Sequence, residues 1–166
     1  MKKLHLSLMF SMICAVANAQ TVQFFTPNTV RIIKEKVPAT EDKSVVVIAK
    51  PKKVKVTKKN IGKATIYKSS ALTVKVEGGR VTFLDEKGNI LTSEGDAVFT
   101  PRTSGSDQNA YKVRQSFSVE ADETIYGIGL LQNGKMSQRG ENRHMTQSNL
   151  EDFAHFFQTI KGYGIY

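Results

Sequence analysis

Short runs of apolar residues, rich in β-branched and aromatic types, recur along most of the chain. They lie at 21–25, 30–33, 44–49, 72–77 and 80–84. Turn-forming pairs such as Pro27-Asn28 and Gly78-Gly79 separate neighbouring runs. Branched and aromatic side chains favour the extended backbone, whereas glycine, proline and asparagine favour turns. The pattern therefore predicts a series of short β-strands joined by tight turns.

The clearest strand pattern is the stretch YKVRQSFSV at 111–119. One face of this strand would carry Tyr111, Val113, Gln115, Phe117 and Val119. A period of two is typical of an antiparallel strand that packs one face on a core. No window of a dozen residues has a helical period, and the best candidate, LEDFAHFF at 150–157, is too short for a stable helix. The sequence thus predicts an all-β fold, an antiparallel β-sandwich.

The first 19 residues have the pattern of a secretory signal peptide. Lys2 and Lys3 precede an apolar run, and Ala17 and Ala19 stand where a signal peptidase reads small residues. We expect cleavage before Gln20, which leaves 147 residues as one β-sandwich domain at 20–166 and lowers the formal net charge from +9 to +7. The apolar run is too short to span a bilayer. The expected location is the periplasm or the exterior of a bacterium.

A lysine-rich stretch, KPKKVKVTKK at 50–59, contains six lysines. Clustered cations suggest a nucleic-acid hypothesis, because they release counterions from phosphate. However, Val54 and Val56 alternate with Lys55, and no arginine or aromatic residue is interleaved. Lysines commonly protect an edge strand from aggregation. We therefore interpret the stretch as an exposed edge strand and expect no nucleic-acid partner.

Residues that could form a catalytic or metal site are sparse. The one cysteine, Cys14, lies in the leader, so the exported chain would have no thiol. His144 and His155 have no metal-ligand spacing, and a zinc site that includes Asp152 is only the minor alternative, because solvated or core histidines are far more common than ligands. No G-x-S-x-G nucleophile motif occurs, and adjacent carboxylates on a strand face opposite ways. The sequence predicts no catalytic residue, no metal site and no cofactor.

The stretch YGIGLLQNGKMSQRG at 126–140 contains four glycines, namely Gly127, Gly129, Gly134 and Gly140. A dinucleotide-binding loop needs G-x-G-x-x-G between a strand and a helix. Gln132 stands in the place of the third glycine, and no helical period follows. Asn133 before Gly134 indicates a tight turn. We interpret these glycines as positions where the backbone bends or approaches closely at sheet ends, not as a phosphate site.

Together with 155–166, this stretch resembles the N-terminal β-sandwich of glycoside hydrolase family 31, a galactose-mutarotase-like domain. Members typically show Y-G-L-G, then a glycine and R-G, and later a K/R-G-Y-G strand. The matching positions are Tyr126, Gly127, Ile128, Gly129, Gly134, Arg139, Gly140, Phe156, Thr159, Lys161, Gly162, Tyr163 and Gly164. Segments 28–33 and 81–94 are similar to the family's early strands. The chain departs from the family at Leu130, where Gln or Glu is usual, and at His155, where proline is usual.

The resemblance implies an accessory role in a larger enzyme. The family contains α-glucosidases and α-xylosidases that act by a retaining mechanism. Such a mechanism uses two carboxylates about 5 to 5.5 Å apart, which in the family lie on a barrel C-terminal to this sandwich. The chain stops at Tyr166 in a strand-like pattern, so we expect a fragment cut before that barrel. By itself it would pack on the barrel without being catalytic.

The resemblance also implies a loop at the substrate entrance, running from Arg139 to Asp152. Gln147 and Asn149 are similar to polar residues found there in relatives, and they would contact the carbohydrate substrate. The alternative is that both amides merely satisfy the loop backbone, as Asn and Gln often do. The sequence leaves both interpretations open.

A second function, from another class, also stays open. An exported basic β-sandwich could be a free-standing carbohydrate-binding or adhesion module. Such modules usually stack sugars on aromatic side chains, above all on Trp, and this chain has no Trp. Tyr126, Tyr163 and Tyr166 could stack on sugars, or they could belong to the core.

Overall fold

The computed structural model describes residues 19–35, 46–105, 110–147 and 149–166. Within these ranges the chain forms antiparallel sheets and no helix, which confirms the predicted all-β fold. The strands are β1 Ala19–Thr26, β2 Thr29–Glu35, β3 Thr57–Ile61, β4 Ala64–Lys68, β5 Thr73–Glu77, β6 Arg80–Leu84, β7 Ile90–Pro101, β8 Tyr111–Phe117, β9 Ile125–Leu130, β10 Asp152–Thr159 and β11 Gly164–Ile165. Of the predicted leader, residues 1–18 lie outside the described part.

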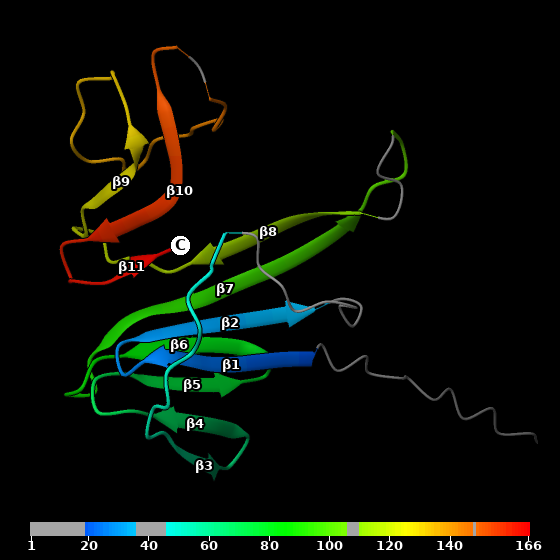
Figure 1. Cartoon of the computed structure of the whole chain (residues 1–166), viewed down its shortest axis with the longest axis vertical. Helices are drawn as coiled ribbons and strands as arrows, with labels where there is room; N and C mark the ends of the chain where they lie inside the picture. The colour runs from blue at the N-terminus through cyan, green and yellow to red at the C-terminus, as the bar shows by residue number, and fades with distance from the viewer. Residues whose placement is uncertain (1–18, 36–45, 106–109, 148) are drawn as a thin grey trace, which may run out of the picture.

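Six consecutive strands form the main sheet, in the order β3-β4-β5-β6-β7-β8. Each strand pairs with the next along the chain, because tight turns such as the one at Gly78-Gly79 reverse the chain between them. The β1–β2 hairpin forms a second layer that lies across this sheet (Figure 1). A third sheet, in the order β11-β10-β9, stands at one end of the long axis, while β3 and β4 lie at the other (Figure 1).

The hydrophobic core lies between the hairpin and the main sheet. Phe24 of β1 packs with Leu72, Val74 and Val81, all of which are buried. The strand alternation explains this, since Val74 pairs across the sheet with Tyr67 and Phe83 on the same face. Partly buried apolar residues complete the core, namely Val22, Val30, Ile32, Val54, Val56, Tyr67, Val76, Phe83 and Leu91. The two layers form the sandwich that the alternation predicted.

A buried ion pair also joins the two layers. Lys34 Nζ of β2 lies 2.6 Å from Glu94 Oε2 of β7, and the two side chains are only 15% and 5% exposed. The same carboxylate oxygen accepts a 2.9 Å hydrogen bond from the Val81 amide. Burial removes both charges from water, so each depends on the other for its electrostatic compensation. The pair therefore holds β2 in one position over β7.

Several strand predictions are confirmed, and others are wrong. The runs at 21–25, 30–33, 72–77, 80–84 and 111–119 coincide with β1, β2, β5, β6 and β8. Residues 46–49 form no strand, and 44–45 lie outside the described residues. Val113 is 62% exposed, because β8 is the edge of the main sheet and neither layer covers that position. The run at 150–157, too short for a helix, lies mostly in β10.

The lysine-rich stretch is an edge strand only in part. Of residues 50–59, only Thr57, Lys58 and Lys59 belong to β3, which is the outer strand of the main sheet. Residues 50–56 have no regular structure, although Val54 and Val56 pack against the core. The alternation of Val54 and Val56 therefore reflects the burial of these two side chains and does not indicate a paired strand. Nothing in the described residues is a helix long and apolar enough to cross a membrane.

Candidate functional site

The glycine segment at 127–129 shapes the hairpin between β9 and β10. Three consecutive residues, Gly127, Ile128 and Gly129, have positive φ values of 105°, 61° and 124°. A Cβ on Gly129 would overlap the Asp152 carbonyl oxygen, and one on Gly127 would lie 2.8 Å from the Phe156 carbonyl oxygen. Only glycine tolerates this approach together with such dihedrals. The two backbones can therefore come together at the point where the pairing register shifts.

Ile128 is the only non-glycine residue with positive φ in the described ranges. A β-branched side chain in this region is strained, at a cost of about 1 to 3 kcal/mol. Neighbouring glycines allow the distortion but do not relieve it at Ile128 itself. The irregular pairing between β9 and β10 is thus a specific feature of this hairpin, stabilised by the structure around it.

Gly134 and Gly140 lie in the long connection between β9 and β10. Both have positive φ, but a Cβ on either would meet no heavy atom within 4 Å. At Gly134 the turn is closed by Asn133, whose side-chain oxygen accepts a 3.2 Å hydrogen bond from the Lys135 amide. The four glycines therefore fall into two kinds: Gly127 and Gly129 permit close backbone approach, while the other two only permit turns.

The same connection is anchored to the sheet by a buried glutamine. Gln138 donates its backbone amide to the Ile125 carbonyl at 2.8 Å and its side-chain amide to the Lys135 carbonyl at 2.9 Å. The neighbouring Arg139 donates through Nη1 to the Glu123 carbonyl at 3.1 Å. These bonds fold the first half of the connection back onto β9 and fix where the predicted entrance loop begins.

The structure gives the two predicted loop residues different surroundings. Both polar atoms of the Gln147 side chain form hydrogen bonds with the backbone of Phe153. Nε2 donates to the Phe153 carbonyl at 3.1 Å, and Oε1 accepts from the Phe153 amide at 2.8 Å. The side chain thereby imitates a β-strand partner and closes the loop at the start of β10. Asn149 is exposed near the end of this loop, three residues before β10 begins. The backbone interpretation therefore fits Gln147.

Asn149 lines a shallow hollow of about 280 Å³. The other lining residues come from the end of β9 and the start of β10, namely Leu130, Leu131, Gln132, Leu150, Glu151 and Asp152. The lining thus combines amide and carboxylate groups with leucine side chains, and such groups can bind the hydroxyls and the ring face of a neutral sugar. Sequence reasoning missed this lining because its two halves are about twenty residues apart in the chain.

A lysine links the third sheet to the main sheet. Lys161 Nζ donates to the Ile90 carbonyl at 2.8 Å, to the Leu91 carbonyl at 3.3 Å and to Glu120 Oε1 at 2.9 Å. Its position just before β11 is set by the turn at Gly162, which brings the Thr159 and Tyr163 backbones together. The K-G-Y-G segment therefore serves as an anchor between sheets.

Glu123 lies buried beside this anchor and is only 1% exposed. Its Oε2 accepts a 3.0 Å hydrogen bond from the Glu120 amide. The Tyr163 hydroxyl and Thr159 lie near the carboxylate. Among the described residues, Glu123 Oε1 and the Tyr163 hydroxyl are buried without a hydrogen bond that meets the usual distance and angle limits.

The surroundings of Glu123 determine its ionisation. Burial alone raises the pKa of this carboxyl, but Tyr163, the Glu120 amide, Thr159 and the charge on Lys161 outweigh burial and hold the pKa below its usual value. Burial and the adjacent Glu123 carboxylate raise the pKa of Tyr163 to about 12. Glu123 is therefore ionised and Tyr163 neutral near pH 7. No local pattern marks this cluster, because its members come from distant segments.

The remaining polar candidates do not converge. His144 and His155 are both exposed, one in the loop and one in β10. In the described part of the chain, no three residues of the His, Cys, Asp and Glu types gather in a way that could hold a metal ion. At the loop, Asn149 and its neighbours bring amide and carboxylate side chains to one hollow.

Known proteins match this chain over most of its length. The family model described as the glycosyl hydrolase 31 N-terminal galactose mutarotase-like domain matches residues 19–162. An α-xylosidase of Saccharolobus solfataricus is 27% identical over 162 residues, covering 87% of this chain and 21% of the relative. The chain thus spans about a fifth of the length of this curated relative.

Two solved structures share the fold. The glycoside hydrolase family 31 α-xylosidase of Xanthomonas citri superposes with a TM-score of 0.73 at 23% identity, over 90% of this chain and 17% of its own. An α-xylosidase of the same family from a soil metagenome, complexed with xylose, superposes with a TM-score of 0.75 at 20% identity, over 87% of this chain and 25% of its own. From the match across residues 19–162, the chain belongs to the family of glycosyl hydrolase 31 N-terminal galactose mutarotase-like domains.

Proposed function

We propose that the chain is the N-terminal accessory domain of an exported retaining α-glycosidase and that its loop from Arg139 to Asp152 shapes the substrate entrance. The observation that carries the proposal is the placement of Asn149. This side chain is exposed in a sugar-sized hollow, on a loop held in position by Gln147. Asn149 donates and accepts hydrogen bonds to sugar hydroxyls, whereas the carboxylates that cleave the bond come from the catalytic barrel.

Exposed apolar residues support packing of this region on the barrel. Large apolar side chains are exposed along the third sheet and its connections, namely Leu130, Met136, Leu150, Phe156, Ile160 and Tyr166. Large apolar side chains that are exposed in an isolated domain are candidates for burial at a protein interface. The barrel would cover part of this surface and bring its own carboxylates toward the hollow. α-Linked xylosides and glucosides are the substrates to screen first, because the similar proteins are named α-xylosidases.

Export is supported by where the folded domain begins. The family match starts at residue 19, and β1 also starts at Ala19, the last residue of the proposed leader. Removal of that leader would leave almost the whole of β1 in place. Mass spectrometry of the secreted product tests this part of the proposal: the expected N-terminal residue is Gln20, and a product that keeps Lys2 and Lys3 contradicts export.

Substitution of Asn149 in the full-length enzyme tests the entrance role. Asn149→Ala removes one amide from the hollow, so kcat/KM should fall about 3- to 10-fold, the effect of one neutral hydrogen bond. Asn142→Ala is the matched control, because Asn142 is also exposed in the loop but does not line the hollow. Unchanged kinetics of the Asn149 variant on every good substrate would contradict the assignment.

Gln147 provides a separate test of the loop's support. In Gln147→Ala the Phe153 amide loses its partner, so hydrogen exchange at Phe153 should accelerate while KM rises. If the substitution changes KM without changing that exchange, Gln147 contacts substrate directly and is not a positioning residue.

A further inference from the structure

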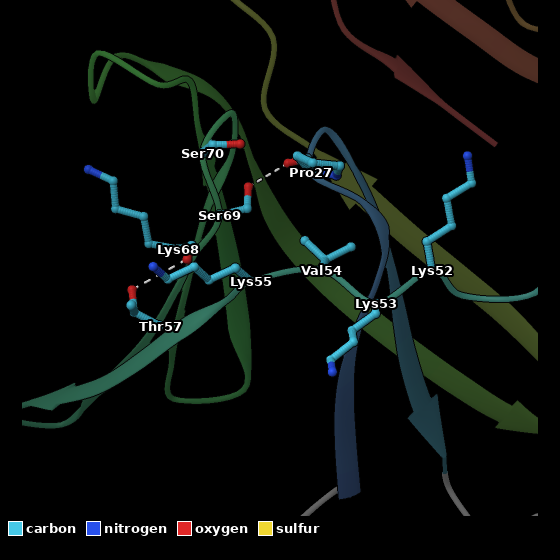
Figure 2. A pocket seen from close by; sticks show the side chains of 9 residues that line it. All are labelled: Pro27, Lys52, Lys53, Val54, Lys55, Thr57, Lys68, Ser69 and Ser70. Carbon is cyan, nitrogen blue, oxygen red and sulfur yellow. Dashed lines mark hydrogen bonds between the residues drawn. The ribbon is translucent and has the colours of Figure 1, made fainter.

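A second hollow, of about 490 Å³, lies at the end of the main sheet far from the entrance loop. Four of its nine lining residues are lysines, Lys52, Lys53, Lys55 and Lys68, and the others are Pro27, Val54, Thr57, Ser69 and Ser70. In Figure 2 the Lys55 and Lys68 side chains extend to the same side, whereas Lys52 extends to the other side beyond Pro27. Two separate segments of the chain thus supply the charge.

The backbone around this hollow is held in place by specific contacts. Val54 and Val56 pack on the core, and the Lys52 amide donates to the Phe25 carbonyl at 3.1 Å. On the opposite wall, the Ser69 hydroxyl donates to the Pro27 carbonyl and accepts from the Leu72 amide at 3.0 Å. The lysines therefore project from a preorganised backbone, which reduces the entropy that a ligand must overcome.

The charge in the hollow is not compensated by neighbouring carboxylates. Four lysines of the described chain pair with an acid, namely Lys34, Lys75, Lys135 and Lys161. Among the described residues, Lys52, Lys53, Lys55 and Lys68 are in no ion pair. Like charges gathered on low-dielectric walls raise the local concentration of anions.

Edge protection does not explain these lysines. Lys58 and Lys59 lie in β3 and would repel a second sheet edge. Lys52, Lys53 and Lys55 precede that strand in irregular backbone, where they protect no row of free backbone groups. Another role is needed for the cations that face the hollow.

We propose that this hollow binds an acidic polysaccharide through the carboxylates of its uronate residues. Ammonium groups pair with carboxylates, while Val54, Pro27 and the aliphatic lysine stems offer an apolar surface to the sugar ring. Single-stranded nucleic acid fits less well, because it needs aromatic stacking platforms and the lining contains none. This site would tether an exported glycosidase to acidic glycans at a place separate from the entrance loop.

Affinity measurements on the full chain test the proposal. The probe is an oligogalacturonate of defined length, and neutral dextran and single-stranded DNA of equal length serve as comparison ligands. Lys55→Gln with Lys68→Gln removes two charges but keeps a polar, unbranched side chain at each position, so affinity for oligogalacturonate should fall about tenfold. Lys87→Gln with Lys112→Gln is the matched control, because these lysines lie outside the hollow and carry the same total charge.

Each outcome supports or overturns the proposal. Tight binding of oligogalacturonate that weakens with salt, is lost in the hollow variant and is kept in the control variant supports it, as does recovery by Lys55→Arg with Lys68→Arg. Equal losses in both variants would show attraction by net charge alone and overturn it. Equal or tighter binding of DNA, or equal binding of dextran, also overturns it. Thermal unfolding of each variant verifies that the fold is intact.

Discussion

The sandwich formed by β1–β8 and the third sheet formed by β9–β11 are stabilised in different ways. The sandwich buries apolar side chains, with Phe24, Val74 and Val81 at its centre. From residue 119 onward, the buried side chains are polar, namely Glu123, Gln138 and Thr159. No apolar side chain described in that region is fully buried, whereas all the buried apolar residues lie in the sandwich. The sandwich therefore carries most of the hydrophobic stabilisation, while the third sheet depends on directed polar contacts.

This difference bears on what each region can do. Apolar burial is non-directional and tolerates change, whereas a buried polar network keeps its geometry only if each member is satisfied. The third sheet positions the loop that we propose for the substrate entrance, and its exposed apolar surface would be covered by the proposed barrel. A region of this kind is expected to open locally before the sandwich unfolds.

The largest effect is expected in the sandwich, at the buried ion pair. Lys34→Ala leaves the Glu94 carboxylate buried without its partner, so the free energy of unfolding should fall by about 3 kcal/mol. Denaturant titration measures the loss. Replacing both residues, Lys34→Met with Glu94→Leu, should restore most of the stability, and Lys75→Ala at an exposed pair should change it by less than about 1 kcal/mol. A double variant as unstable as the single one would contradict this account.

Gly129→Ala should cause the second-largest loss of stability, and this loss should be confined to the third sheet. An alanine there meets the Asp152 carbonyl in a backbone with φ of 124°, so we expect β9 and β10 to separate locally, with a loss of about 2 kcal/mol. Hydrogen exchange of β10 amides measures it. Gly140→Ala is the control, with φ of 75° and open space, and should cost about 1 kcal/mol. Equal costs at the two positions would argue against close backbone approach as the cause.

Loss of the Lys161 anchor should reduce local stability by less than the Gly129 substitution does. Lys161→Met keeps the aliphatic stem but removes the bonds to Ile90, Leu91 and Glu120, so protection of β10 and β11 should fall by about 1.5 kcal/mol. Protection of β5 amides should not change. A uniform loss across both regions would mean that the two regions unfold as one unit, and the comparison would fail.

The smallest effect is the pH dependence of the third sheet. Because the folded pKa of Glu123 is held below its ordinary value of 4.5, the carboxylate stabilises the fold above that pH. This contribution is lost as the pH falls through the folded pKa. Protection of the Ile160 amide should therefore decline on acidification below about pH 4.5, and Glu123→Gln should flatten that decline. An unchanged profile in the variant would assign the decline to other carboxyls.

Local sequence patterns predicted much of the sandwich. Tight turns and alternation placed β5, β6 and most of β8 correctly, because strand formation there depends on neighbouring residues. The pattern at 44–49 misled in its described part, because β propensity is only a tendency and residues 46–49 form no strand. Val54 and Val56 also alternate without pairing, because the core buries them from outside the sheet.

At the candidate site, the sequence predicted the loop from Arg139 to Asp152 but not the separate roles of Gln147 and Asn149 within it. The G-x-G pattern of Gly127 and Gly129 marked an unusual backbone, but Ile128 between them does not suggest positive φ in the sequence. Gln147 and Asn149 are both amides in one loop, and only the structure distinguishes the residue bonded to Phe153 from the residue at the hollow. Contacts across the loop decide this, and they depend on the close approach at Gly129.

By itself the sequence determined the strand content, the turns, the family and the charge of the lysine-rich stretch, because these follow from the order of neighbouring residues. Tertiary structure decided that Lys34 meets Glu94, that Glu123 is buried beside Tyr163, and that Lys55 and Lys68 face one hollow. Lys34 and Glu94 are 60 residues apart and Glu123 and Tyr163 are 40 apart, while Lys55 and Lys68 come from two different segments. Such pairs form only after folding has overcome the entropy of closing long loops, so no local pattern encodes them.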